Sequence, residues 1–143
     1  MTIPARFDWV PGQHCFLRFR YFGIHALTSH PFTICSLPGT LEDGGSELTF
    51  YIRHGKGLTA KLHDLAQEKP GCTIPVYVDG PYGGVDDRNL DDSDRLLVIA
   101  GGSGAGWILP FIEQYIQSHL LARTKKQPQT KSEETIISSD DDI

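Results

Sequence analysis

The stretch His-Pro-Phe-Thr-Ile-Cys-Ser, residues 30–36, decides how this chain folds. Pro31 has no N–H group to donate and biases the residue before it away from the α region, so we expect an extended segment with Pro31 at a sheet edge or a strand start. Alternation places Phe32 and Ile34 on one face and Thr33 and Cys35 on the other. A hydroxyl and free backbone beside an aromatic ring suit a flat heterocycle such as a flavin, although a plain core strand shows the same pattern.

Length and composition indicate a globular chain. Its 143 residues can bury a sizeable core, and 39% are hydrophobic against 22% charged. We find no apolar run of about 18 residues, which a membrane-spanning helix needs, and no secretory signal in residues 1–8. We therefore expect the chain itself to be soluble.

The cysteines and histidines do not form a recognisable ligand pattern. Cys15, Cys35 and Cys72 are widely spaced, and the six histidines include no helical i,i+4 pair. We therefore expect reduced thiols and no metal site.

The net charge of −5 disfavours nucleic acid as a partner. Residues 1–70 carry seven basic against six acidic side chains, and residues 71–143 carry six against twelve. The net charge is therefore positive only in the first half, which also contains the helix start near Gly57 where we expect a diphosphate group to bind.

Period-two patterns predict strands around the central stretch. Residues 9–12 form a turn, and 13–21 should be a strand with Cys15, Leu17 and Phe19 on one face. Further strands are expected at 47–53 and 74–78.

A helix is predicted from about Leu58 to Glu68, ending before Pro70-Gly71. Gly57 permits close approach of the backbone, Thr59 adds a hydroxyl, and the first-turn N–H groups can hold a phosphate. An ordinary glycine-preceded helix remains the alternative.

The second half of the chain predicts a turn, an acidic linker and then a strand followed by a helix. Residues 79–84 are predicted to form a tight turn, and the aspartate-rich segment 86–94 a linker between two domains. The apolar run 95–100 predicts a buried parallel strand, followed by a glycine turn and a helix to about Ala122. We expect Pro110 in the first turn of that helix.

Several segments resemble, in order, the ferric reductase and NADPH oxidase family. They are W-x-P-G-Q-H-x-F-L-R-F at residues 9–19, H-P-F-T-I-x-S at 30–36, the segment 52–59, D-G-P-Y-G at 79–83, and A-G-G-S-G-x-x-x-x-L-P at 100–110. The resemblance implies a mainly β fold: an antiparallel flavin-binding β-barrel with one short helix over residues 1–85. The acidic linker 86–94, the first β-α unit of an NADP-binding domain at 95–123 and a disordered tail at 124–143 would follow. Because only eight residues precede the first predicted turn, we expect the barrel to lack a strand at its start.

The resemblance also implies a set of cofactor-binding residues. Those expected near the isoalloxazine of FAD are His30, Pro31, Phe32, Thr33 and Ser36. Those expected at the FAD pyrophosphate are Tyr51, Ile52, Arg53, Gly57, Leu58 and Thr59. Gly80, Pro81, Tyr82 and Gly83 would lie where the flavin and nicotinamide domains meet. Gly101, Gly102, Ser103, Gly104 and Gly106 would form the NADPH phosphate turn.

By this resemblance the chain is the FAD-binding module of an NADPH-dependent ferric-chelate reductase-like oxidoreductase. In the family, electrons pass from NADPH through FAD to haem in a membrane domain, and then to iron, copper or oxygen, with the flavin module on the cytoplasmic face. We expect no catalytic acid, base or nucleophile in the chain. One alternative is a truncated flavodomain without turnover that acts only by binding. Another is a ferredoxin-reductase-type flavoprotein, which is disfavoured because that group has Arg-x-Tyr-Ser where this chain has His-Pro-Phe-Thr.

Overall fold

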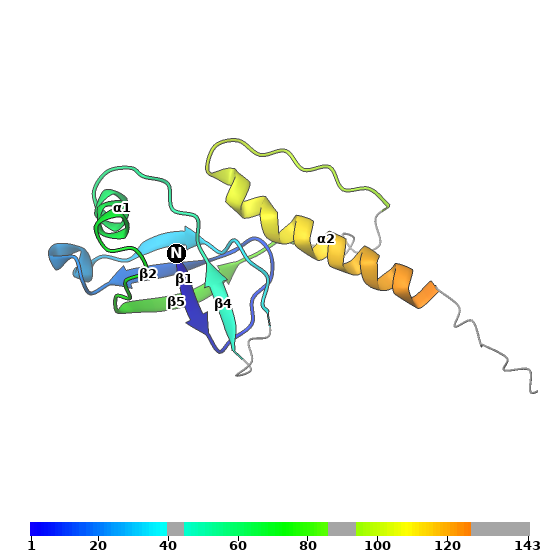
Figure 1. The fold of residues 1–143 in the computed structure, drawn as a ribbon, viewed down its shortest axis with the longest axis horizontal. Helices are drawn as coiled ribbons and strands as arrows, with labels where there is room; N and C mark the ends of the chain where they lie inside the picture. The colour runs from blue at the N-terminus through cyan, green and yellow to red at the C-terminus, as the bar shows by residue number, and fades with distance from the viewer. Residues whose placement is uncertain (40–44, 86–93, 127–143) are drawn as a thin grey trace, which may run out of the picture.

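The computed structural model describes residues 1–39, 45–85 and 94–126, with side chains up to residue 121. Most of the predicted linker 86–94 and of the predicted tail 124–143 lies outside these ranges. Figure 1 shows two small sheets, a short helix at one end of them and a long helix that projects away. The elements are β1 (Thr2–Ala5), β2 (Gln13–Phe19), the 3-10 helix η1 (Gly23–Leu27), β3 (His30–Thr33), β4 (Ser46–Thr49), α1 (Leu58–Glu68), β5 (Val76–Gly83) and α2 (Gly104–Lys126).

The larger sheet is antiparallel and has the order β3-β2-β5. Strand β2 is central, with His14 opposite Thr33 of β3 on one side and Tyr82 of β5 on the other. Because β3 is an edge strand, Pro31 removes no ladder bond from a central position. The prediction of an extended edge at residues 30–33 is confirmed.

The smaller sheet pairs β1 with β4 in antiparallel register, from Thr2 opposite Thr49 to Ala5 opposite Ser46. The expectation that no strand precedes the first turn is therefore wrong. Ile3 and Ala5 alternate with polar or exposed neighbours and point into the core, which gives this short segment one buried face.

Backbone hydrogen bonds join the two sheets. The Cys35 N–H donates to the Thr49 carbonyl at 2.8 Å, and the Ile34 N–H donates to the Gln13 carbonyl at 3.0 Å. The segment that follows β3 thus connects β2 of one sheet with β4 of the other. This mainly β, antiparallel arrangement is the fold class that the sequence predicted.

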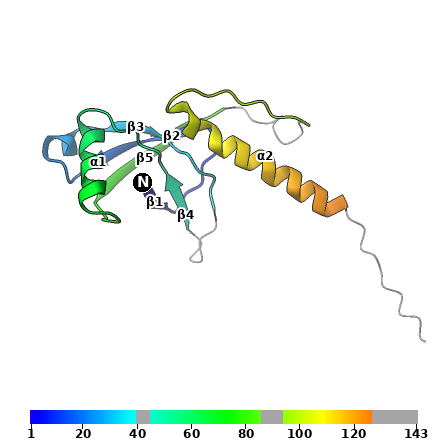
Figure 2. The ribbon, with the colours of Figure 1, turned by 45° about the horizontal axis from the view of Figure 1, so that its top comes forward.

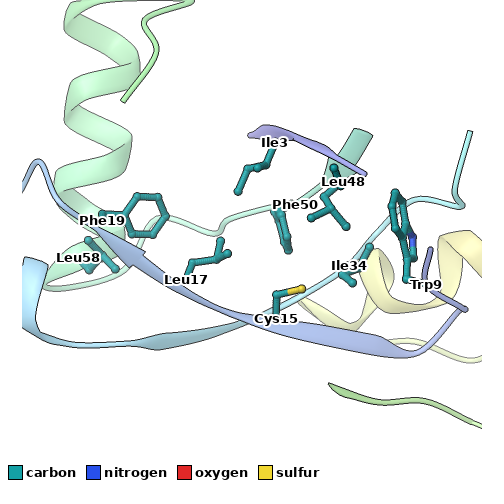
Figure 3. Packing of buried hydrophobic residues seen from close by; sticks show 10 residues of the cluster. Ile3, Trp9, Cys15, Leu17, Phe19, Ile34, Leu48, Phe50 and Leu58 are labelled. Carbon is teal, nitrogen blue, oxygen red and sulfur yellow. The ribbon is translucent and has the colours of Figure 1, made fainter. Parts of the chain in front are cut away.

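One hydrophobic core lies between the sheets and α1 (Figure 3). Cys15, Leu17 and Phe19 of β2 are fully buried, as the alternation predicted. The core residues are Ile3, Ala5, Trp9, Cys15, Leu17, Phe19, Ile34, Leu48, Phe50 and Leu58. Among the described residues no buried side chain is polar or charged, so apolar burial is the main stabilising term.

Helix α1 has the predicted bounds, Leu58–Glu68. Leu58 is buried in the core, and Gly57 before it has φ 64° and ψ −124°, which lets the chain turn sharply into the helix. Figure 2 shows α1 beside one end of the sheets.

Helix α2 also forms, but its surroundings differ from the prediction. It begins at Gly104 and continues to Lys126, so Pro110 lies in the second turn and not in the first. Pro110 has no N–H group to donate within the helix, and both Pro110 and Phe111 are buried.

The predicted strand 95–100 is absent. Residues 94–100 run as extended coil beside α2 in Figures 1 and 2, and the Leu97 and Ile99 side chains are each 86% exposed. A parallel strand needs a neighbouring strand for its hydrogen bonds, and in the described part of the chain none lies beside this segment.

The predicted turn at 79–84 is also wrong, because β5 continues through Gly83. A register irregularity between His14 and Phe16 accommodates this part of β5, where a Cβ atom on Gly80 would lie 3.1 Å from the His14 carbonyl oxygen. Glycine is needed there for close strand approach.

Within the described ranges, neither helix combines the length and the apolar character needed to cross a membrane.

Candidate functional site

An open groove of about 710 Å³ separates the end of the β4 segment from the start of α2. It is lined on one side by Tyr51, Ile52 and Arg53 and on the other by residues of the glycine-rich turn and α2, namely Gly102, Ser103, Ala105, Gly106 and Leu109. Its volume falls in the range of about 300–1,000 Å³ typical of small-molecule sites. The structure thus unites two predicted ligand segments that are about 50 positions apart in the sequence.

Two side chains of the groove are available to a ligand. Tyr51 lines the groove and is 65% exposed, so its side chain is accessible to a ligand. Arg53 is exposed, and no carboxylate in the described residues pairs with it. A flat ring system and an anionic group are the ligands that such a pair would contact.

Strand β3 has an outer face that carries Pro31 and Thr33. Phe32 points inward and packs edge-on against Phe19 and Phe50, with ring centroids 6.2 and 6.4 Å apart. Pro31 is exposed and Thr33 half-buried, as alternation predicted. The Phe32 side chain therefore belongs to the core, and only its backbone can contact a ligand on the outer face.

Cys35 connects the β3 face to the groove. Its Sγ atom lies 3.4 Å from the Thr33 carbonyl oxygen, and the Tyr51 backbone N–H donates to the thiol. Burial raises the pKa of Cys35, while the Tyr51 N–H and the N-terminal charge oppose that rise. The neutral thiol is thus a packing group between Thr33 and Tyr51.

The start of α1 contributes a possible anion site. No side chain caps this helix, so the first-turn N–H groups are left for solvent or a ligand. The Thr59 hydroxyl donates to the Lys56 carbonyl at 3.2 Å and can still accept a hydrogen bond. Arg53 lies four positions before Gly57, so the groove and the helix start are connected by one short segment.

His30 and Gly57 both approach the same histidine. The His25 and His30 rings are 6.1 Å apart, and a Cβ atom on Gly57 would lie 3.9 Å from the His25 ring. The His30 ring also shares a hydrogen bond of 2.8 Å with the Thr28 hydroxyl. The two predicted FAD segments thus meet through η1, although no sequence signal singled out His25.

Three aromatic side chains line the outer face of the larger sheet; the sequence analysis predicted Tyr82 as a site residue but missed His14 and Phe16. His14, Phe16 and Tyr82 have ring centroids 5.5 to 6.2 Å apart. His14 lies opposite Thr33, so this cluster continues the outer face of β3. The alternation of β2 could have identified His14 and Phe16 as an outward pair.

Other predicted site residues have structural partners. The Ser36 hydroxyl donates to the Glu47 carbonyl and accepts from the Thr49 N–H, each at 3.1 Å, so it joins its segment to β4. The Tyr82 hydroxyl donates to Asp79 at 2.6 Å, which raises the pKa of Tyr82. Gly80, Pro81 and Gly83 lie in β5 beside β2.

The glycine-rich turn, predicted at residues 101–106, leads directly into helix α2, which begins at Gly104. Gly102 has φ 56°, and the Gly104 N–H donates to the Gly101 carbonyl at 3.0 Å as the helix begins. Gly106 is buried against Cys35 and the Tyr51 ring, so a side chain there would fill the contact between helix and sheet. Gly101 and Gly104 do not line the groove.

A second cavity, of about 520 Å³, lies between α1 and the ends of β1, β2 and β5. Its walls are mainly apolar, with Ile3, Phe19 and Leu62 among them. Of the predicted ligand residues only Ile52 and Thr59 reach it, so we place the candidate site in the 710 Å³ groove.

The fold and this groove define a class of protein: an antiparallel β domain whose groove, of a volume typical of small-molecule sites, lies between the segment after β4 and the start of α2. Comparison with known families matches residues 1–86 to a family described as FAD-binding domain. The chain belongs to this FAD-binding domain family.

Individual relatives agree with this assignment. The chain is 33% identical over 105 residues to ferric/cupric reductase transmembrane component 7 of Saccharomyces cerevisiae, covering 73% of this chain and 15% of that protein. It is 30% identical over 120 residues to Probable metalloreductase AIM14 of Candida tropicalis, covering 78% of this chain and 18% of that protein. A dihydroorotate dehydrogenase electron transfer subunit of Thermoplasma acidophilum is 30% identical over 108 residues, with coverage of 72% and 40%. The chain thus spans less than a fifth of the fungal relatives.

Proposed function

We propose that the chain is the FAD-binding module of a ferric-chelate reductase-like oxidoreductase that uses NADPH. The observation that carries the proposal is the groove shared by residues 51–53 and the glycine turn before α2. Its volume, its exposed Tyr51 side chain and Arg53, which no carboxylate of the described residues pairs with, fit a flavin dinucleotide.

Each part of the site would have a separate task. The Thr33 hydroxyl and the backbone of β3 would hydrogen-bond the edge of the isoalloxazine, and Tyr51 would cover part of the ligand. Arg53 and the N–H groups at the start of α1 would neutralise the diphosphate. Gly102 and Ser103, on the opposite wall, would receive the phosphates of NADPH.

The redox chemistry would come from the bound cofactor, which would supply hydride acceptance from NADPH and one-electron transfer to haem in a membrane domain. The chain's own residues would bind and orient FAD. The terminal acceptor would be iron, copper or oxygen, and the module would lie on the cytoplasmic face of the membrane. The ferric/cupric and metalloreductase names of the relatives support a metal acceptor.

FAD titration of the purified chain tests the binding site. We expect saturable quenching of flavin fluorescence, and a dissociation constant raised about tenfold or more in Arg53→Gln, because a charge-assisted contact contributes roughly 1.5–3 kcal/mol. Arg20→Gln is the matched control, since Arg20 is held by the Tyr77 hydroxyl at 3.2 Å. A colourless protein that does not bind added FAD would disprove the proposal.

A second function is favoured by the exposed, unpaired segment 94–100, which is not built into a nicotinamide domain in the described residues. On this view the chain holds FAD without turnover. Adding NADPH to the FAD-loaded chain separates the two: bleaching of the flavin absorbance supports the first function, and an unchanged spectrum supports the second.

A further inference from the structure

Two histidines that share no sequence motif meet beside α1. His54 lies in the connection from β4, and His63 lies on α1 nine positions later. Their ring centroids are 4.6 Å apart, and the ring planes are inclined by 59°. Asp64 follows His63, with its Oδ1 atom 3.6 Å from His63 Nδ1. One ligand atom from each of the three residues lies within 4.8 Å of the others. The sequence predicted no metal site, because its histidines have no i,i+4 spacing on a helix; the fold brings these three residues together from two segments.

We propose that His54, His63 and Asp64 bind one divalent transition-metal ion of the Zn²⁺ type. Two imidazole nitrogens and one carboxylate oxygen are a donor set that suits Zn²⁺, with water completing a tetrahedral shell. Mg²⁺ and Ca²⁺ prefer oxygen ligands and would bind this set poorly. The proposal goes beyond FAD binding and does not depend on it.

The geometry is close to what such an ion requires. Tetrahedral donors at about 2.0–2.1 Å from zinc lie roughly 3.4 Å apart, so the three ligand atoms must move inward by about 1 Å. All three side chains are exposed, so this movement needs rotation of surface side chains and no rearrangement of the core. Solvent exposure also leaves the ion a direct path to the site.

Occupation of the site would have a local structural effect. His54 belongs to the segment between Arg53 and Gly57, whereas His63 and Asp64 belong to the second turn of α1. A shared ion would therefore cross-link the connection to the helix that it precedes. Such a cross-link stabilises the folded state by an amount that grows with the logarithm of the free metal concentration once that concentration exceeds the dissociation constant.

One thiol must be controlled in the test. Cys72 is exposed and lines the same 520 Å³ cavity as His63. Thiolates bind Zn²⁺ strongly, so we would use the full chain with Cys72→Ser as the reference protein. A large excess of Mg²⁺ in the buffer would occupy sites made of carboxylates alone.

Isothermal titration of Zn²⁺ into this reference protein should show one ion per chain. We expect His54→Gln and His63→Gln each to weaken binding by about tenfold or more, and Asp64→Asn to weaken it as well, because each removes a ligand. His119→Gln is the matched control, since His119 lies on α2 and its Nδ1 is 3.0 Å from the Tyr115 carbonyl oxygen. It should leave the affinity unchanged.

Thermal unfolding gives an independent readout. Zn²⁺ should raise the midpoint of the reference protein and of His119→Gln, but not of His54→Gln or His63→Gln. Because His54, His63 and Asp64 are exposed, their variants should show the same far-ultraviolet circular dichroism as the reference protein. Equal Zn²⁺ affinity in the control and in both histidine variants, or no one-to-one binding, would overturn the proposal.

Discussion

A Cβ atom added to Gly106 would lie 2.9 Å from the Sγ atom of Cys35 and 3.5 Å from the Tyr51 ring. This contact seats the first turn of α2 on the segment between β3 and β4. Since Gly106 also lines the 710 Å³ groove, the same glycine sets both the packing of the helix and the width of the candidate site.

Replacing Gly106 by alanine should therefore destabilise the domain. A well-packed contact that must admit a methyl group typically loses about 1–3 kcal/mol, which exceeds the gain in helix propensity of about 1 kcal/mol at most. Gly104→Ala is the matched control, because nothing lies within 4 Å of its added Cβ atom. In urea unfolding, Gly106→Ala should have a lower free energy of unfolding than Gly104→Ala. The reverse order would mean that α2 does not pack against Cys35.

The same Leu→Ala substitution at positions 17 and 97 compares the stability contribution of a core residue with that of a surface residue. Leu17 is fully buried, whereas Leu97 is 86% exposed. We expect Leu17→Ala to reduce the free energy of unfolding by about 2–5 kcal/mol, and Leu97→Ala to change it by no more than about 0.5 kcal/mol. A large loss in Leu97→Ala under denaturant unfolding would show that the segment 94–100 is packed in solution.

Gly57 is required by its backbone conformation. With φ 64° and ψ −124° it lies where L-residues are strained, so Gly57→Ala should cost about 1–3 kcal/mol of stability. Gly101→Ala is the control, since Gly101 has no positive φ and no atom within 4 Å of an added Cβ. The comparison uses thermal unfolding of the two variants. If FAD binding depends on the start of α1, Gly57→Ala should also weaken it.

The thiol of Cys72 should react with a disulfide reagent much faster than the thiols of Cys15 and Cys35. Cys72 is exposed, while Cys15 and Cys35 are buried. Burial is the main cause that raises the pKa of both buried thiols; Asp79 adds to the rise at Cys15. Because the thiolate is the nucleophile, native protein treated with a chromogenic disulfide should show one fast thiol, and the other two should react only as the chain unfolds. Three fast thiols would contradict the packing described for β2 and Cys35.

The raised thiol pKa values also set a pH dependence. The folded state holds these protons more tightly than the unfolded state, so their contribution to stability is complete below the ordinary thiol pKa of about 8.5 and is lost as pH rises through the higher folded values. We expect the melting temperature to fall from neutral pH toward about pH 9.5, and to fall less steeply in Cys15→Ala/Cys35→Ala. An equal slope in the double variant would assign the pH dependence to other groups, such as Tyr82.

Local pattern alone was enough to predict several elements. The inward face of β2, the extended edge at 30–33 and both ends of α1 follow from period-two alternation, from Pro31 and from leucine spacing closed by Pro70-Gly71. These features depend on residues a few positions apart, and the sequence contains that information directly. The family motifs pointed to FAD for the same reason.

Contacts between distant segments needed the tertiary structure. It placed Thr2–Ala5 against β4, left 94–100 without a partner strand and brought Arg53 to one groove with Ser103. It also brought His54 to His63, although no sequence spacing indicated that pair. Hydrophobic periodicity determines which face of a segment is buried. Which segments then meet depends on the packing of the whole core, and only the folded chain decides that.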